Sequence, residues 1–558
     1  MKSIIFQLSK QYTSSEFYNY NFGVYYKRLY SEIAQIVDDY NVTGNYNFQF
    51  QTAVNIATIT VNNIPFSKME SLSDCIVTTE TFFYEHTSQK IYLHFSDNSR
   101  QLDKEINVGV IMGFSNVFNG NTSNFYNSIL YDERLKDVTN PSKKADASFF
   151  GKLKYSPFTA KFINTDGFFD RWVDGNFYAT ECQVLFADNA EVYEDFEQIA
   201  SGFISDHSIT STEFSLTCDD PRKGLEQPVA TNILTTAEFA SLPDDSKDAR
   251  KPVVYGKAFK RKCTLVNDTT HQYVFCDTQF NIPTVLNGVY NDTGTLTPAT
   301  TTLSSGTFTL SAASDSDVFA TFTMPITNGV SIIKDLLLRY DNKTFISSYW
   351  DITEVDAAQA LCTNTSIYDS EGKKLSELIE KICFDCDLRF FIKDNGKYTI
   401  RKYDANRTPV KTILWDDWAD DFTITNTGSD YLTDCTVKYE YNEMDSIYNK
   451  KYFNSDYQSI SYDTYKKYKT KEFDSGLYEQ SAAIAKSNTI MLFSYNIKDI
   501  VERSVNWNFY DLELFDFVYA APKTRVKNIS NEVLAKYEVI GISKNLNNKT
   551  IKLTLKEV

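Results

Sequence analysis

The chain has 558 residues, and 73 Asp and Glu against 56 Lys and Arg give it a formal net charge of −17. This length predicts about three to five domains and excludes a single small scaffold, and the acidic excess argues against a dedicated nucleic-acid binder because it repels phosphate. Aromatic residues make up 15% of the chain, whereas Gly and Pro number only 20 and 12, so we predict a β-rich protein.

The first 150 residues predict one helix and several strands. Helical spacing of apolar residues over 25–39 indicates an amphipathic helix, and alternation over Ile91–Phe95 indicates a strand with one wet face. Met1–Lys10 has an apolar core too short for a signal peptide, and no apolar run approaches the roughly 18 residues of a spanning helix. We therefore expect no membrane anchor. Asn140–Lys144 reads as a linker ahead of a β-rich block.

The middle of the chain combines polar connectors with a well-defined helix and hairpin. Ser241–Asp248 is a polar connector, and residues 293–316 predict short polar strands and loops. Residues 375–386 carry one apolar stripe at helical spacing, after which the period changes to two over Leu388–Ile392. A turn at Asp394–Lys397 then returns the chain, so we predict a helix followed by a β-hairpin.

The C-terminal part predicts a strand, a helix and a closing hairpin. Cys435–Tyr439 alternates between apolar and polar residues, and a helix is expected to begin near Tyr478 and end by about Phe493. Tyr537–Ile542 and Ile551–Leu555 flank a polar turn and predict a terminal hairpin.

The nine cysteines are odd in number and scattered, unlike a secreted disulfide framework. We interpret them as mostly reduced core residues. The single CxxC, Cys383–Cys386, closes the predicted helix and continues its apolar stripe. A structural zinc site needs two more ligands, and a redox CxxC normally precedes a helix. Core packing is therefore favoured over both alternatives.

No pattern of catalytic residues stands out. His86, His94, His207 and His271 are dispersed without metal-binding spacing, and Asp38–Asp39 and Asp219–Asp220 are interpreted as solvated turns. No nucleophile elbow, Walker motif or dinucleotide fingerprint occurs, and the abundant carboxylates mark out no glycosidase pair. We expect no catalytic residue, no metal site and no cofactor.

Two aromatic runs, Phe82–Tyr84 and Tyr439–Tyr441, have rings that could stack on sugars. Sheet cores and interfaces use the same residues, and this second interpretation is favoured.

Several segments together resemble a known family. The run Phe162–Asp170, Cys182–Phe186, Asp195–Glu197, Ile199–Asp206 and Phe214–Arg222 is similar to the barrel of tail-hub and baseplate proteins of long-tailed bacteriophages. Arg250–Lys257 resembles the conserved-looking "kPvvyG" segment of such proteins. The helix and hairpin at 373–400 and the terminal hairpin fit the same pattern, so the resemblance covers about half of the chain.

The resemblance implies a mainly β, multidomain fold with minor α+β parts. It comprises tail-tube-like split β-barrels, a small β-sandwich and a helix-hairpin module. The expected domains are a mixed α/β module at 1–150, a first tail-tube-like barrel at 151–240, a small β domain at 241–350, a helix plus hairpin at 351–424, and a second barrel at 425–558.

The same resemblance implies a structural protein of the virion tail, made in the host bacterial cytoplasm and without enzymatic activity. Its expected role is a hub or distal baseplate protein that joins the tail tube to the tip or spike and forms part of the DNA conduit. Its expected partners are copies of itself in a ring, the tube, tape-measure and tip or spike proteins, and viral DNA in transit only.

Two barrels per chain favour a trimer, with a hexamer of single barrels as the alternative. An acidic lumen would keep DNA from sticking. A host-surface glycan-binding adhesin and a tail-associated cell-wall hydrolase remain alternatives.

Overall fold

The computed structural model describes most of the chain from residue 225 onwards and mainly strands before it. The described residues are 2–13, 45–49, 55–61, 64–68, 81–85, 90–94, 106–115, 125–126, 129–132, 134–145, 153–167, 169–170, 180–188, 196–219, 225–279, 281–425, 431–522, 534–546 and 548–558. They fall into two compact units. The first lies within residues 1–142, 156–221 and 394–396, and the second within 143–155, 222–393 and 397–558.

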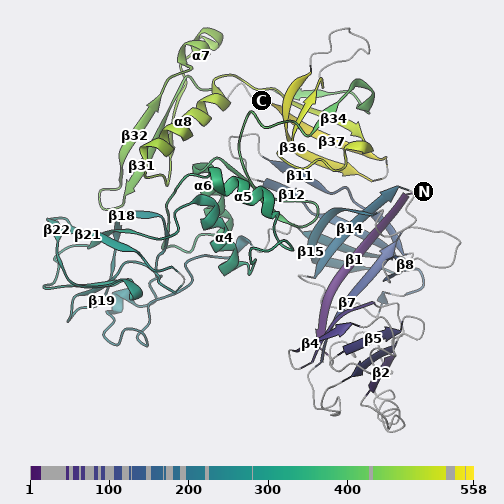
Figure 1. The fold of residues 1–558 in the computed structure, drawn as a ribbon, viewed down its shortest axis with the longest axis horizontal. Helices are drawn as coiled ribbons and strands as arrows, with labels where there is room; N and C mark the ends of the chain where they lie inside the picture. The colour runs from purple at the N-terminus through teal and green to yellow at the C-terminus, as the bar shows by residue number, and fades with distance from the viewer. Residues whose placement is uncertain are drawn as a thin grey trace. The chain divides into compact units, whose positions relative to one another are not determined.

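Unit one is built on one long, mostly antiparallel sheet (Figure 1). Its order is β10-β13-β16-β15-β14-β1-β7-β3-β4-β5-β6-β2, with β9 beside β7 and β8 beside β9. The bounds are β1 Lys2–Thr13, β2 Asn45–Gln49, β3 Asn55–Val61, β4 Ile64–Lys68, β5 Thr81–Glu85, β6 Lys90–His94, β7 Ile106–Ser115, β8 Phe125–Tyr126, β9 Ile129–Asp132, β10 Leu135–Val138, β13 Phe158–Ile163, β14 Glu181–Asp188, β15 Glu197–Ile209 and β16 Glu213–Asp219. Because β10 also approaches β1, the six strands from β10 to β1 curve into a half-barrel.

Buried and exposed residues alternate along the strands of this half-barrel, and the buried ones form its core. Every second residue of β13 and β16 is buried. Three of the buried rings meet there: Phe169 stacks on Phe214 with ring centroids 4.5 Å apart, and Phe162 lies 5.7 Å from each. The buried Asn164 amide donates to the Asp170 carboxylate at 2.8 Å, which ties the turn after β13 to this core.

The N-terminal part of unit two is a small β block. It contains β17 Val253–Tyr255, β18 Lys257–Lys262, β19 Thr264–Asn267, β20 Gln272–Val274, β21 Val285–Asn291, β22 Gly294–Leu296, β23 Pro298–Thr302, β24 Thr307–Leu310 and β25 Phe319–Thr323. Phe275, Phe308 and Phe322 lie at the centre of its apolar core. The short strands β22–β24 confirm the prediction for residues 293–316.

Three helices and a hairpin form the next layer. They are α4 Gly329–Tyr340, α5 Ile352–Leu361, α6 Leu375–Asp385, β27 Leu388–Ile392 and β28 Tyr398–Lys402, with β26 Ile367–Asp369 paired to β17. α5 packs on β28 and α6 on β27, around the fully buried Trp350. The predicted helix and hairpin are confirmed, because a stripe at period 3.6 and a run at period 2 each have one apolar face to bury.

The following segment is a strand-helix arm in which α8 covers two long strands (Figure 1). It contains β31 Asp434–Asn442, β32 Ile447–Asn454, α7 Gln458–Tyr465, β33 Thr470–Asp474 and α8 Gln480–Ser494. β31 pairs with β32, β33 and, at one position, with β18 of the small β block. The predicted strand at 435–439 and the predicted helix at 478–493 are confirmed.

The chain ends in an eight-stranded sheet that also takes in two earlier segments. The order β12-β11-β36-β37-β34-β30 is extended by β35 and β29. The bounds are β11 Ser142–Ala145, β12 Leu153–Ser156, β29 Lys411–Ile413, β30 Thr423–Thr425, β34 Ile500–Asn506, β35 Phe517–Ala520, β36 Ala535–Asn545 and β37 Thr550–Glu557. The predicted terminal hairpin is confirmed, whereas the predicted linker at 140–144 already contains the start of strand β11.

The described residues confirm the mainly β fold class, with five α-helices among them. The predicted helix at 25–39, with Asp38–Asp39, lies outside them. The five predicted domain ranges stay a prediction. No helix among the described residues is long and apolar enough to cross a membrane.

Two arginines attach the β27–β28 hairpin to the C-terminal sheet. Arg389 and Arg401 face each other across the hairpin and are almost fully buried. Arg389 contacts Glu538 of β36 at 3.3 Å, and Arg401 contacts Asp516 at 2.7 Å. Arg401 also pairs with Glu354 of α5 at 3.1 Å, and Arg407 holds the other oxygen of that carboxylate at 2.9 Å. Burial raises the pKa of Glu354, but these two guanidinium groups outweigh it and lower the pKa overall.

Removal of Arg401 should destabilise unit two. Its side chain is 7% exposed, so Arg401→Met leaves the buried Asp516 without its cation, while Glu354 keeps only Arg407. We expect the free energy of unfolding in urea to fall by about 3–5 kcal/mol. Arg407→Met is the matched control, because Arg407 contacts the same glutamate but is 30% exposed. It should cost about 1 kcal/mol or less, and equal losses for the two variants would contradict the prediction.

Glu502 should make part of the stability depend on pH. It accepts from Lys144 of β11 and Lys552 of β37, both at 2.9 Å, and these hydrogen bonds lower its pKa from 4.5 to about 2. A lowered folded-state pKa stabilises the fold above pH 4.5 and ceases to do so as the pH falls towards about 2. Glu502→Gln should therefore lower the melting temperature at neutral pH, by an amount that shrinks as the pH drops through this window. A difference in melting temperature between the variant and the wild type that stays the same at every pH would refute this prediction.

Candidate functional site

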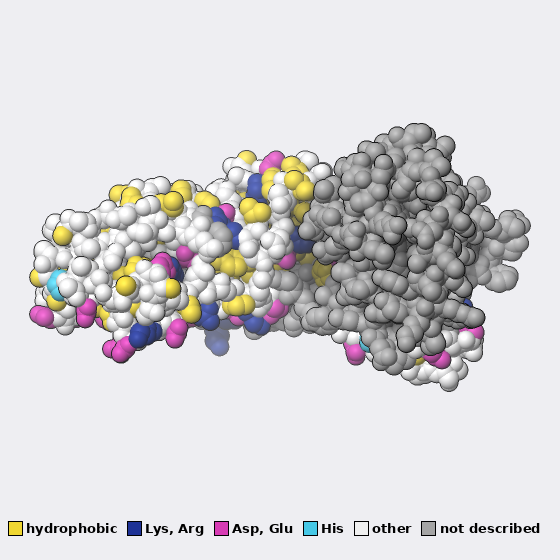
Figure 2. All heavy atoms as spheres, turned by 90° about the horizontal axis from the view of Figure 1, so that it is seen from below, with side chains coloured by type: hydrophobic (Ala, Val, Ile, Leu, Met, Phe, Trp, Pro, Cys, Tyr) yellow, Lys and Arg dark blue, Asp and Glu magenta, His cyan; other side chains and the backbone are white. Residues whose placement is uncertain are grey.

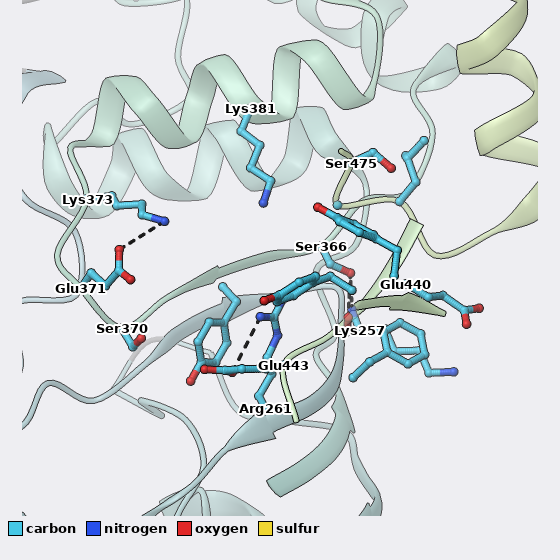
Figure 3. Close-up of a pocket in the computed structure, with 16 residues that line it drawn as sticks. Lys257, Arg261, Ser366, Ser370, Glu371, Lys373, Lys381, Glu440, Glu443 and Ser475 are labelled. Carbon is cyan, nitrogen blue, oxygen red and sulfur yellow. Dashed lines mark hydrogen bonds and ion pairs between the residues drawn. The ribbon is translucent and has the colours of Figure 1, made fainter. Parts of the chain in front are cut away.

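A polar pocket of about 280 Å³ lies in unit two between α6, the small β block and the strand-helix arm. Figure 3 shows side chains entering it from five segments of the chain. They come from β18, from the stretch that contains β26 and the turn after it, from α6, from β31–β32 and from the loop before α8. The lining residues are Lys257, Phe259, Arg261, Ser366, Tyr368, Ser370, Glu371, Lys373, Lys381, Glu440, Tyr441, Glu443, Tyr448, Ser475, Gly476 and Leu477.

Backbone geometry at Gly256 sets the position of β18 in this wall. Gly256 has φ +72°, and a Cβ there would lie 2.2 Å from the carbonyl oxygen of Thr365. Only glycine fits this conformation at this close approach. The next residue, Lys257, donates its N–H to Ser366 Oγ at 2.9 Å, and Ser366 Oγ donates back to the Lys257 carbonyl at 2.8 Å. The "kPvvyG" segment seen in the sequence therefore ends at the first strand of the pocket.

The loop before α8 is fixed by a buried carboxylate. Asp385, the last residue of α6, accepts from Thr365 Oγ1 at 2.9 Å and from the Gly476 N–H at 3.0 Å. Burial raises the pKa of this carboxyl group. Next to it, the buried Lys486 of α8 donates to Asp387 at 2.9 Å. These contacts hold the end of α6 against the arm.

A change of backbone direction turns one aromatic side chain into the pocket. Tyr439 is buried in the core of the arm, yet Tyr441, two residues on, lines the pocket. The intervening Glu440 has φ +57° and donates its N–H to the Leu477 carbonyl at 2.9 Å. This positive φ breaks the regular alternation of the strand. Tyr441 then packs on its cross-strand neighbour Tyr448, with ring centroids 5.1 Å apart.

Arg261 lies between two of the aromatic rings. Its guanidinium carbon is 4.5 Å from the centroid of Tyr368 and 5.0 Å from that of Tyr441. Its contact with Glu443 is long, at 3.8 Å, and its buried Nε has no acceptor among the described residues. Burial lowers the pKa of this guanidinium group, and Glu443 acts in the opposite direction.

Lys381 reaches into the pocket from the polar face of α6 (Figure 3). Its ammonium group has no ion-pair or hydrogen-bond partner among the described residues. Desolvation lowers its pKa, Asp385 acts in the opposite direction, and Arg261 and Lys373 lower it further. Solvent still reaches the side chain through the mouth of the pocket. Lys381 is thus a solvent-exposed cation with two other cations, Arg261 and Lys373, nearby.

The carboxylates of the pocket are already paired with cations. Glu371 pairs with Lys373 at 3.4 Å, and Glu440 with Lys450, outside the pocket, at 2.6 Å. Glu443 accepts the N–H of Lys262 in addition to its contact with Arg261. Lys257 lies over the ring of Phe259 at 4.9 Å and pairs with no acid among the described residues. The pocket thus favours an anion over a cation.

This local excess of positive charge contrasts with the rest of the visible surface. On the face shown in Figure 2, basic and acidic side chains lie interspersed among apolar ones. A second surface feature lies on the arm, where the side chains of Ile447, Phe453, Ile460 and Tyr468 are each more than half exposed. Apolar side chains exposed this far favour contact with another protein.

The residues singled out in the sequence do not converge on a site. His207 lies on β15, with its ring 6.4 Å from Phe214, and His271 lies in the turn before β20. Only the backbone of His94 is described, and His86 lies outside the described residues. No His, Cys, Asp or Glu cluster suited to a metal occurs in the described parts of the chain.

The cysteine prediction is confirmed for the eight that are described. All eight are free and seven are buried, while Cys75 lies outside the described residues. Cys383 and Cys386 both pack in the core beside α6. Burial raises the pKa of the Cys383 thiol, as expected for an inert core residue.

Little in the sequence indicates the pocket. The run Tyr439–Tyr441 has rings that could stack on sugars, and one of its two tyrosines lines the pocket. Lys381 occupies a polar helix position that no motif distinguishes. The five segments are too far apart in the sequence for spacing alone to connect them.

Neither a family model nor a curated protein shows a significant match to the sequence. Solved structures of tail proteins are distantly similar to it. The tail protein from Neisseria meningitidis MC58 has a TM-score of 0.36 at 10% identity, covering 76% of this chain and 97% of that one. The prophage MuSo2 43 kDa tail protein from Shewanella oneidensis has a TM-score of 0.36 at 10% identity, with 77% and 96% covered. A chain from the virion of a native gene transfer agent particle has a TM-score of 0.40 at 8% identity, with 60% and 89% covered.

Lys381→Met should not destabilise the protein. The variant removes a cation that has no partner among the described residues and lies near Arg261 and Lys373, so we expect its melting temperature to equal or exceed that of the wild type. Lys486→Met is the matched comparison: burial lowers the pKa of that lysine too, but its ammonium pairs with Asp387. Its loss should lower the melting temperature clearly. A similar drop for Lys381→Met would show that its ammonium stabilises the fold.

Proposed function

We propose that the protein is a structural component of a phage tail tip or baseplate hub, which joins the tail tube to the tip or spike and forms part of the DNA conduit. The observation that carries this proposal is the presence of two separate, largely antiparallel sheets in one chain. One is the half-barrel of β10, β13, β16, β15, β14 and β1, and the other is the C-terminal sheet from β12 to β30. They contain the segments whose order resembles the barrels of tail-hub proteins.

Assembly into a ring would pair or cover the open edges of these sheets. Among the described strands, β12 and β30 each pair on one side only and leave backbone donors and acceptors at the sheet edges. Such edges are commonly paired or covered in an assembly. A closed ring of identical chains does this by symmetry. With two barrel-like sheets per chain, three chains supply six around a sixfold tube, and a hexamer is the alternative.

The other properties of the chain agree with this role. The net charge of −17 suits a passage through which DNA moves without binding. The exposed apolar residues of β32 and α7 suit contact with a neighbouring copy or another tail protein. Tube, tape-measure and tip or spike proteins are the proposed partners, and the virion tail is the proposed location.

The mass in solution tests the assembly. We expect light scattering after size-exclusion chromatography to give three times the monomer mass, or six times for the hexamer, and negative-stain images to show rings. Phe453→Asp should shift the protein towards monomers, because it places a charge on the exposed apolar surface of β32. Leu361→Asp, at the exposed end of α5, is the control and should leave the mass unchanged. A wild-type protein that stays monomeric at high concentration would contradict ring formation.

A further inference from the structure

We propose that the pocket beneath α6 binds a phosphorylated sugar, with Lys381 and Arg261 holding the phosphate and Tyr441 and Tyr448 lying beside the sugar. This site is separate from the sheet edges on which the tail role rests. Its presence or absence therefore leaves the proposed assembly untouched.

The first argument is the charge left over in the pocket. The three glutamates that line it already contact Lys373, Lys450 and Arg261. Lys381 then remains without an acid partner among the described residues, and Arg261 keeps a buried N–H without an acceptor. Like charges near one another repel unless an opposite charge joins them. A bound anion would supply both the charge and the missing acceptor.

The second argument selects phosphate among anions. A phosphate monoester carries about −1.5 to −2 charges near neutral pH and has three acceptor oxygens. Arg261 comes from β18, whereas Lys381 descends from α6 on the other side of the pocket (Figure 3). Donors that approach from different directions suit a tetrahedral group better than a flat carboxylate. More than one unpaired cation also calls for more than one negative charge.

The third argument concerns the body that carries the phosphate. A volume of about 280 Å³ far exceeds the roughly 30 Å³ occupied by one water molecule, so a bare phosphate ion would leave much of the pocket unfilled. Tyr441 and Tyr448 line the pocket, and their hydroxyl groups have no hydrogen-bond partner among the described residues. Glu440 still has acceptor capacity beyond its contact with Lys450. Hydroxyl and carboxylate groups beside aromatic rings suit a sugar.

Isothermal titration calorimetry on the full chain tests the site with three probes: glucose 6-phosphate, inorganic phosphate and glucose. We expect glucose 6-phosphate to bind most tightly, inorganic phosphate about tenfold more weakly, and glucose not measurably. Lys381→Met and Arg261→Met should each weaken glucose 6-phosphate binding about tenfold or more. Tyr441→Ala should weaken binding of the sugar phosphate but not of inorganic phosphate.

Lys247→Met is the matched control, since this exposed lysine lies outside the pocket and should bind like the wild type. The melting temperature of each variant separates lost binding from lost folding. The proposal is overturned if neither phosphate probe binds, or if Lys381→Met and Arg261→Met bind as well as the control. It is also overturned if inorganic phosphate binds as tightly as glucose 6-phosphate, which would indicate a site for the anion alone.

Discussion

The packing of unit two depends on neutralising two buried positive charges that lie side by side on the β27–β28 hairpin. Arg389 and Arg401 are cross-strand neighbours, and both are almost fully buried. Such a pair repels and is expensive to desolvate unless acids meet it. Glu538 and Asp516, from the C-terminal region, and Glu354 of α5 meet this demand. The hairpin can therefore pack on its neighbours in only one position, in which both arginines meet their acids. Apolar packing alone would let the hairpin shift slightly.

The same ion pairs also help to hold the walls of the pocket in place. The helix α6 that carries Lys381 leads directly into β27, so its C-terminal end is held where the hairpin docks. Asp385 and the Lys486–Asp387 pair then fix the arm with Tyr441 and Tyr448 against the same helix end. The compensated charges lie in the core, and the uncompensated ones line the cavity. That contrast is typical of a protein that gives up some stability where a ligand is to bind.

The spacing of apolar residues in the sequence predicted the helices and hairpins that form from neighbouring residues. The helix at 375–386, the hairpin after it, the helix before 494 and the terminal hairpin each have a single apolar face whose spacing reveals their period. Pairing between distant segments has no such signature. Nothing near Ser142–Ala145 indicates that this strand belongs beside β36. Likewise, the alternation over Tyr439–Tyr441 predicts a common face for both rings, and only the positive φ of Glu440 separates them.

The strand pairing of β11 and β12 also bears on how the chain can be synthesised and folded. This short hairpin leaves the ribosome between strands of unit one, yet its partner β36 is made only after nearly all of unit two. Domains that fold as they emerge cannot complete themselves in this order. The C-terminal sheet must wait until β34–β37 have been made, so a product truncated before them would leave β11 and β12 without their partner strands.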